Sequence, residues 1–191
     1  MRVRYFAKRS VLSLVFFLAY TGSPVVAAET FSLTSPNLKD GGTVQAAQVY
    51  AGYRCTGENI SPALSWQGAP AATRSYAVTV FDPDARTGKG WWHWLIYNLP
   101  AATTGLPANA GDIAAALAPK GSVQSVTDFD AVGYGGPCPP IGDKPHRYVF
   151  TVFALDIERV PLAATSPPET VRDMLDAHAL AKASFTAYYG R

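Results

Sequence analysis

Two histidines, two aspartates and a tyrosine stand close to turns or among aromatic residues. Asp82 ends an alternating run and Asp84 follows it beyond a proline, whereas His146 and Tyr148 begin another run. His93 lies between tryptophans in a third run. Imidazole and phenol groups donate hydrogen bonds, and a carboxylate can orient an imidazole or accept a proton. Two of the histidines, together with Asp82, could therefore form one site.

A loop rich in glycine and proline precedes the run that His146 begins. Residues 133–142 have the sequence GYGGPCPPIG, which is stiff at its prolines and permissive at its glycines. Its backbone N–H groups could line a small anion pocket. Each polar residue also has an ordinary explanation, since an aspartate at a strand end is commonly a turn residue and a histidine among aromatics commonly bonds a carbonyl in the core.

Two alternating runs predict strands that would carry these groups to one edge. Residues 75–81, SYAVTVF, stop at a turn-rich DPD, so Asp82 lies where the strand ends. Residues 148–155, YVFTVFAL, predict a second strand, with His146 and Tyr148 on one face near its start. The side chains that could do chemistry therefore gather at strand ends beside turns.

A third run is apolar throughout. Residues 91–98, WWHWLIYN, fit a strand that is buried on both faces. Strict alternation places His93 on the face of Trp91, Leu95 and Tyr97. The expected surroundings of this imidazole are therefore apolar.

The C-terminal part predicts one helix and a last strand. Residues 166–169, SPPE, fit a capping box with serine as N-cap and proline at the first helical position. The apolar residues that follow at helical spacing are Val171, Leu175 and Ala179. Residues 183–189 then alternate, which predicts a strand. A second short helix is predicted at 110–117, although Gly111 weakens it.

The first 28 residues predict a secretory signal peptide. Four basic residues precede an apolar run of ten, VLSLVFFLAY, and small residues follow before Ala28. We expect cleavage after Ala28 or Ala27 and a periplasmic or secreted protein without stable membrane insertion. An uncleaved anchor is the alternative, but a membrane span needs about 20 apolar residues.

Removal of residues 1–28 reverses the sign of the net charge. The chain of 191 residues has 16 basic and 14 acidic side chains, and the removed segment takes away four basic and no acidic ones. Anion binding must then come from local donors, and nucleic-acid binding is not expected. With 48% apolar and 16% charged residues the chain is not disordered. Residues 29–191 predict one β-rich domain with peripheral helices.

The predicted export affects whether the two cysteines are expected to form a disulfide. Cys55 and Cys138 are the only ones in the chain, and in an oxidising compartment an even number favours a disulfide. A bond that closes so long a loop would stabilise the fold by about 4–5 kcal/mol. Two buried free thiols are the alternative, because the sequence does not place the two side chains within bonding distance.

Several segments together resemble the phosphatidylethanolamine-binding protein family, also called the Raf kinase inhibitor-like proteins. They are CTGENISPALSW at 55–66, DPDA at 82–85, WHW at 92–94, GYGGPCPP at 133–140 and HRY at 146–148. Their order and spacing match across nearly all of residues 29–191. The first segment and the GPCPP sequence resemble the bacterial branch most closely.

The resemblance implies a Greek-key β-sandwich of two antiparallel sheets with helices at the edge, and a pocket for phosphate-bearing or other anionic ligands. The family's motif Asp-Pro-Asp-Ala-Pro ends here in Arg86, which places a positive charge near the rim. Carried over one by one, the pocket residues are Asp82, Asp84, His93, Gly135, Gly136, Pro137, His146 and Tyr148. No cofactor and no metal are implied, and the family's name suggests a protein partner.

Two other classes of function compete with a binding protein. An Asp–His pair could activate water in a hydrolase, but the chain has no Gly-x-Ser-x-Gly motif, and Cys138 between prolines is a poor nucleophile. Two histidines and an aspartate could hold a transition metal, although their spacing carries no metal signature. We therefore predict an exported, non-catalytic protein that binds a small anionic ligand and could modulate a partner protein.

Overall fold

The computed structural model describes residues 1–3 and 30–191. The apolar run and the cleavage site of the predicted signal peptide lie outside these ranges. Within them, no helix has both the length and the apolar character that crossing a membrane requires.

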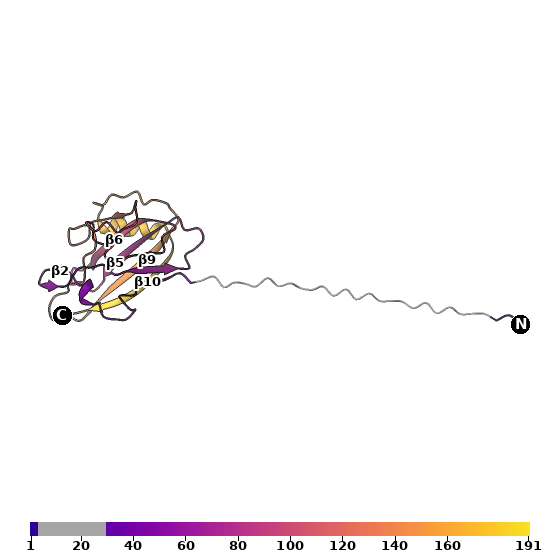
Figure 1. Ribbon diagram of the computed structural model, residues 1–191, viewed down its shortest axis with the longest axis horizontal. Coiled ribbons are helices and arrows are strands. Elements are labelled where there is room, and N and C mark those ends of the chain that lie inside the picture. The colour runs from indigo at the N-terminus through magenta and orange to yellow at the C-terminus, as the bar shows by residue number, and fades with distance from the viewer. Residues whose placement is uncertain (4–29) are drawn as a thin grey trace.

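A five-stranded antiparallel sheet, in the order β10-β9-β5-β6-β8, forms the centre of the molecule (Figure 1). Its strands are β5 (Ser75–Asp82), β6 (Trp91–Pro100), β8 (Val123–Gln124), β9 (His146–Leu155) and β10 (Ala179–Tyr189). The four longer strands were predicted and are confirmed. After excursions through other strands the chain returns to place β9 beside β5, as in a Greek-key connection.

A smaller sheet, in the order β1-β4-β7, covers one face of the central sheet. Its strands are β1 (Ser32–Thr34), β4 (Leu64–Gln67) and β7 (Gly105–Leu106). Leu64 and Trp66 of this sheet share one apolar core with Val78, Trp94 and Phe150 of the central sheet. Because apolar side chains alternate inward on both sheets, the predicted sandwich forms.

The helix α1 (Pro168–Ala177) belongs to a second apolar cluster, in which Val171 and Leu175 pack with Leu95 and Tyr97 of β6. The helix was predicted correctly, but the predicted capping box does not form. The N-cap residue is Pro167, which has no side-chain acceptor, and the carboxylate of the expected capping glutamate accepts a hydrogen bond from a lysine instead. The helix ends before Ala179, which begins β10.

The short helix predicted at 110–117 is wrong, because this segment forms turns. Asn109 and Ala116 have φ angles of 65° and 51°, in the left-handed region that a right-handed helix excludes. Gly111 packs against Tyr134 and Ser61 so closely that no Cβ would fit. Tertiary packing therefore overrides the helical pattern here.

A β-bulge in β6 changes the side on which His93 lies. Val80 of β5 pairs with Trp94 and Phe81 pairs with Trp92, so His93 is the extra residue between them. Its ring consequently contacts Tyr148, whereas Leu95 and Tyr97 belong to the cluster around α1. The strict alternation that we predicted is wrong at this point, and the bulge aims the imidazole at the edge where β5 ends.

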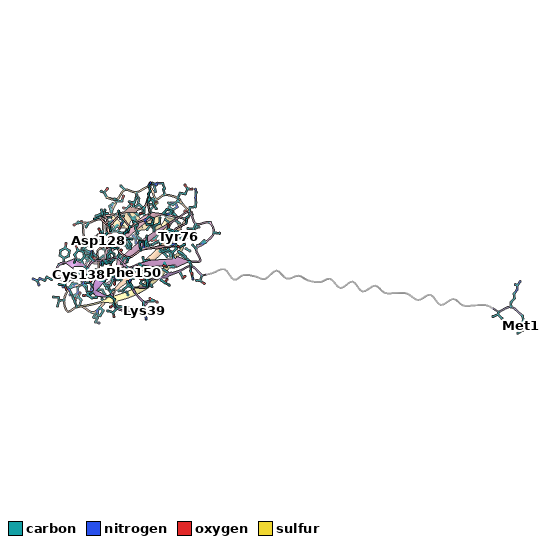
Figure 2. The ribbon with its side chains drawn as sticks, viewed as in Figure 1. Met1, Lys39, Tyr76, Asp128, Cys138 and Phe150 are labelled. Carbon is teal, nitrogen blue, oxygen red and sulfur yellow. A yellow bond between two sulfur atoms is a disulfide. The ribbon has the colours of Figure 1, made fainter. Side chains whose placement is uncertain are left out.

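A disulfide joins Cys55 and Cys138, whose Cα atoms are 6.0 Å apart. It decides between the two interpretations of the cysteines in favour of a bond. The bond ties the hairpin of β2 (Ala51–Gly52) and β3 (Cys55–Thr56), which follows a 3-10 turn at Ala46–Gln48, to the loop at 133–142. β2 in Figure 1 and Cys138 in Figure 2 lie at the same end of the molecule.

Candidate functional site

A cavity of about 490 Å³ opens where β5 ends and its neighbours β6 and β9 begin. These ends coincide because both neighbours run antiparallel to β5. Of the predicted site residues, Asp82, His93, His146 and Tyr148 line the cavity. The other lining residues are Tyr53, Ala85, Arg86, Thr87, Trp91, Phe129, Cys138, Pro139 and Pro140.

His146 lies between two buried carboxylates. Its Nδ1 is 2.7 Å from Oδ2 of Asp82, and its Nε2 is 3.3 Å from Oδ2 of Asp143. The ring donates to both carboxylates only when both nitrogens carry a proton. The other oxygen of Asp82 accepts the backbone N–H groups of Asp84 and Ala85, at 2.8 and 3.1 Å. Asp82 and His146 therefore form their hydrogen bonds with other protein groups, and they act by holding the loop after β5 and the start of β9 in position.

Arg86 extends this network to the cavity rim. Its guanidinium forms an ion pair with the second oxygen of Asp143, while its side chain is 74% exposed. Within the described part of the chain, this is the one interaction found for the guanidinium. Because a guanidinium has five N–H donors, several stay available to an anion in the cavity.

His93 has very different surroundings. Its Nδ1 is 2.6 Å from the carbonyl oxygen of Gly135, which can only accept, so Nδ1 carries the proton and the neutral ring has its lone pair on Nε2. The rings of Phe129 and Tyr148 stand edge-on at 5.2 and 5.1 Å. Burial lowers the pKa of His93 to about 4, against the opposing effect of the hydrogen bond to Gly135. At neutral pH this ring offers the cavity an acceptor.

The hydroxyl of Tyr148 is buried and has no hydrogen-bond partner among the described residues. Burial above all raises the pKa of this phenol, so the hydroxyl keeps its proton and can donate. An unpaired buried hydroxyl destabilises a fold by about 1–3 kcal/mol. The side chain lines the cavity, so its hydroxyl is a donor that the described residues leave unused.

Asp84 does not line the cavity, because Arg147 holds it on the outer side of the strand ends. Its carboxylate accepts the backbone N–H, Nε and Nη2 of Arg147 at 2.7–2.9 Å. The hydrogen bonds from Arg147 are the main cause that lowers the pKa of Asp84 to about 2. This pair anchors the loop after β5 to the start of β9, and the same loop presents Arg86 to the rim.

Gly135, Gly136 and Pro137 are not among the residues that line the cavity. The N–H of Gly135 donates to the carbonyl of His93 at 2.8 Å, and that of Gly136 donates to Oδ1 of Asn59 at 2.8 Å. Proline has no N–H to offer. Contrary to our expectation, these N–H groups have partners inside the protein, and their segment serves to hold His93 and the loop in place.

Several site residues were missed by sequence reasoning. Asp143 and Phe129 sit in turn-rich segments and give no signal of their own. Tyr53 lies two residues before Cys55, so its place beside the loop of Cys138 follows once the disulfide is assumed. Among the described residues, no three histidine, cysteine, aspartate or glutamate side chains converge on a point where they could hold a metal ion.

Residues 34–190 match the family model named "Phosphatidylethanolamine-binding protein". The chain belongs to this family. It is 46% identical over 162 residues to the UPF0098 protein YbcL of Escherichia coli K12, which covers 85% of this chain and 88% of that protein. It is also 46% identical over 157 residues to YbhB of the same organism, covering 82% of this chain and 98% of YbhB.

Solved structures of relatives have the same fold. The crystal structure of Escherichia coli YbcL, described as a member of the mammalian PEBP family, superimposes with a TM-score of 0.83 over 84% of this chain and 98% of that one, at 46% identity. A homologue from Chlamydia trachomatis gives a TM-score of 0.70 at 29% identity, covering 84% of this chain and 97% of its own. Membership implies a ligand-binding protein from a generally non-catalytic family.

Proposed function

We propose that this protein is an exported binding protein for a small phosphate-bearing ligand, held in the cavity at the end of β5. The observation that carries the proposal is Tyr148, whose side chain lines the cavity and whose buried hydroxyl has no hydrogen-bond partner among the described residues. The guanidinium of Arg86 supplies the positive charge that an anion needs, at the rim of the same cavity.

The donors and acceptors suit a phosphate ester that still carries one proton. Tyr148 and Arg86 donate to phosphate oxygens, and Nε2 of His93 accepts the remaining P–O–H. A dianion would turn an oxygen lone pair toward the lone pair of His93. We therefore infer that the cavity takes the monoanion in preference to the dianion.

The surroundings of the cavity also favour binding over hydrolysis. Cys138 is bonded to Cys55, and the hydroxyl of Thr87 donates to the carbonyl of Gly90 at 2.6 Å. His146 has a carboxylate at each ring nitrogen. None of these lining groups is an activated nucleophile, which supports a non-catalytic role.

Calorimetric titration with methyl phosphate between pH 5 and 8 tests the proposal. We expect affinity to rise as pH falls through the second ionisation of the ester, near about pH 6. Methyl sulfate, a monoanion throughout this range that has no proton to donate, should bind more weakly and with a flat pH profile. Tyr148→Phe and Arg86→Gln should each lower the affinity for methyl phosphate about tenfold. Affinity that rises with pH, or that ignores both substitutions, would contradict the proposal.

Export and a protein partner are the remaining parts of the proposal. The basic start, the apolar run and the small residues before Ala28 support export. So does a Mycobacterium tuberculosis relative named as the lipoprotein LppC, 34% identical over 146 residues, which covers 76% of this chain and 63% of that protein. N-terminal sequencing of protein from the periplasm should begin at residue 28 or 29. A protein partner would contact the same rim and should compete with methyl phosphate.

A further inference from the structure

The cavity is larger than a phosphate group requires. Its volume is about 490 Å³, whereas a water molecule occupies about 30 Å³ of liquid, and cavities of about 300–1,000 Å³ hold drug-sized ligands. The groups that we assign to the phosphate are confined to Tyr148, His93 and Arg86. Most of the remaining wall is apolar, so the ligand has an organic part that this wall contacts.

Three aromatic side chains, Tyr53, Phe129 and Trp91, form one side of the cavity, which we call the aromatic wall. Tyr53 and Phe129 are both nearly parallel to Tyr50 behind them, with interplanar angles of 15° and centroid distances of 5.6 and 4.6 Å. Trp91 stands edge-on to Phe129 at 5.5 Å. Tyr53 and Phe129 also stack on each other, with an interplanar angle of 23° and centroids 6.2 Å apart, so the rings form one continuous aromatic surface that is suited to a flat group.

Tyr53 is held at this wall by a strained turn. Tyr53 and Arg54 have φ angles of 48° and 66°, a conformation that favours glycine or asparagine between two hairpin strands. Burial does not explain a tyrosine here, because its side chain is 70% exposed. Backbone strain at an exposed aromatic residue beside a cavity is typical of a ligand contact.

The strained turn is fixed to the adjacent loop at 133–142, which also contributes to the cavity wall, by two independent links. The disulfide joins Cys55, at the end of the turn, to Cys138. The guanidinium of Arg191 donates to the carbonyl oxygens of Pro139 and Arg54, at 2.7 and 2.8 Å. These links fix the backbone of the turn, and the ring of Tyr53 stacks on that of Tyr50, which together reduce the ordering entropy that binding must overcome.

We propose that the aromatic wall binds a flat, aromatic substituent, so that the ligand is an aryl or heteroaryl phosphate ester. This inference rests on the proposed phosphate-binding function of the same cavity. A quaternary ammonium group could also contact aromatic faces. The positive charge of Arg86 in the same lining disfavours that alternative.

Phenyl, cyclohexyl and methyl phosphate, titrated by calorimetry at pH 6, separate the parts of the proposal. Wild type should bind phenyl phosphate about tenfold more tightly than methyl phosphate, with cyclohexyl phosphate clearly weaker than phenyl phosphate. Tyr53→Asn removes the ring and keeps a residue that tolerates positive φ, so the fold is preserved. It should reduce the preference for phenyl over methyl phosphate to about threefold or less without changing the affinity for methyl phosphate. Tyr53→Phe is the matched control and should retain the full preference.

The other outcomes overturn the inference in distinguishable ways. Equal binding of phenyl and methyl phosphate, or a preference that survives in Tyr53→Asn, would contradict the proposed role of the aromatic wall. The proposed phosphate site would be unaffected by either result. Cyclohexyl phosphate that equals phenyl phosphate, or phosphocholine that binds more tightly than both, assigns the wall to another class of substituent. If no phosphate ester binds, the proposed function and this inference fail together.

Discussion

His93 and His146 line one cavity, yet their surroundings give them opposite roles. His146 has a carboxylate at each ring nitrogen, and through Asp143 it is linked to Arg86. His93 has a carbonyl at one nitrogen, aromatic rings around it and a pKa lowered to about 4 by burial. The first histidine organises charge, and the second presents a neutral acceptor. The presence of a histidine in a pocket therefore does not show that this histidine donates a hydrogen bond to an anion.

The largest effect should come from removing His146. In His146→Leu the buried carboxylate of Asp82 loses the imidazole that lies 2.7 Å from it, and we expect the free energy of unfolding in urea at pH 7 to fall by about 3–5 kcal/mol. The matched variant His93→Leu deletes a neutral ring and one hydrogen bond to Gly135, so its loss should be clearly smaller. Equal losses in the two variants would break the distinction between the histidines.

The second-largest effect should be the change of stability with pH. The pKa of His93 is about 4 in the folded protein and about 6.5 when unfolded, so the unfolded state binds more protons between these values. Stability is then complete above about pH 6.5 and is lost as pH falls, by about 3 kcal/mol at pH 4. Denaturant unfolding across this range measures the loss, and His93→Gln should lack this component. An unchanged profile in His93→Gln would show that the buried ring is not its source.

Tyr148→Phe should separate stability from binding. Because the hydroxyl has no partner in the described structure, its removal should raise the free energy of unfolding of the ligand-free protein by about 1 kcal/mol. The same variant should bind methyl phosphate about tenfold more weakly. Tyr134→Phe is the control, since its hydroxyl donates to the carbonyl of Gln48 at 2.9 Å and its loss should destabilise. Destabilisation by Tyr148→Phe would mean that the hydroxyl has an internal partner.

The smallest effect should be at Asp84, whose ion pair with Arg147 lies outside the cavity. With side chains 32% and 51% exposed, such pairs contribute at most about 1 kcal/mol. Asp84→Asn should therefore lower the free energy of unfolding by less than that, and should weaken binding slightly by loosening the loop of Arg86. Calorimetry and thermal unfolding check both parts. A loss as large as that of His146→Leu would place Asp84 within the cavity network.

Much of the fold was predictable because strand periodicity and turn residues mark the central sheet. Asp82, His146 and Tyr148 were placed correctly at one edge, since all three lie at strand ends whose alternation is regular. His93 was assigned to the wrong face, because no pattern in the sequence predicts the bulge in β6. The capping of α1 failed because the helix begins one residue later than the serine requires.

The roles of the site residues were less predictable than their positions. Whether Gly135 and Gly136 point N–H groups into the cavity depends on Asn59 and on the carbonyl of His93, which are distant in sequence. That Asp143 is a partner of His146 follows only from the positions of the two side chains in the structure. Contacts between distant segments decide which donors are free, and periodicity carries no information about them.

Nitrogen-15 NMR of the histidine rings, recorded at pH 6 with and without methyl phosphate, tests the central claim most directly. In the free protein, His93 should carry its proton on Nδ1 and a lone pair on Nε2. On addition of methyl phosphate the Nε2 resonance of His93 should shift as it accepts a hydrogen bond, whereas the ring nitrogens of His146 should change little. A proton on Nε2 of free His93, or an Nε2 resonance that the ligand leaves unchanged, would contradict the assignment of this histidine as the acceptor of the site.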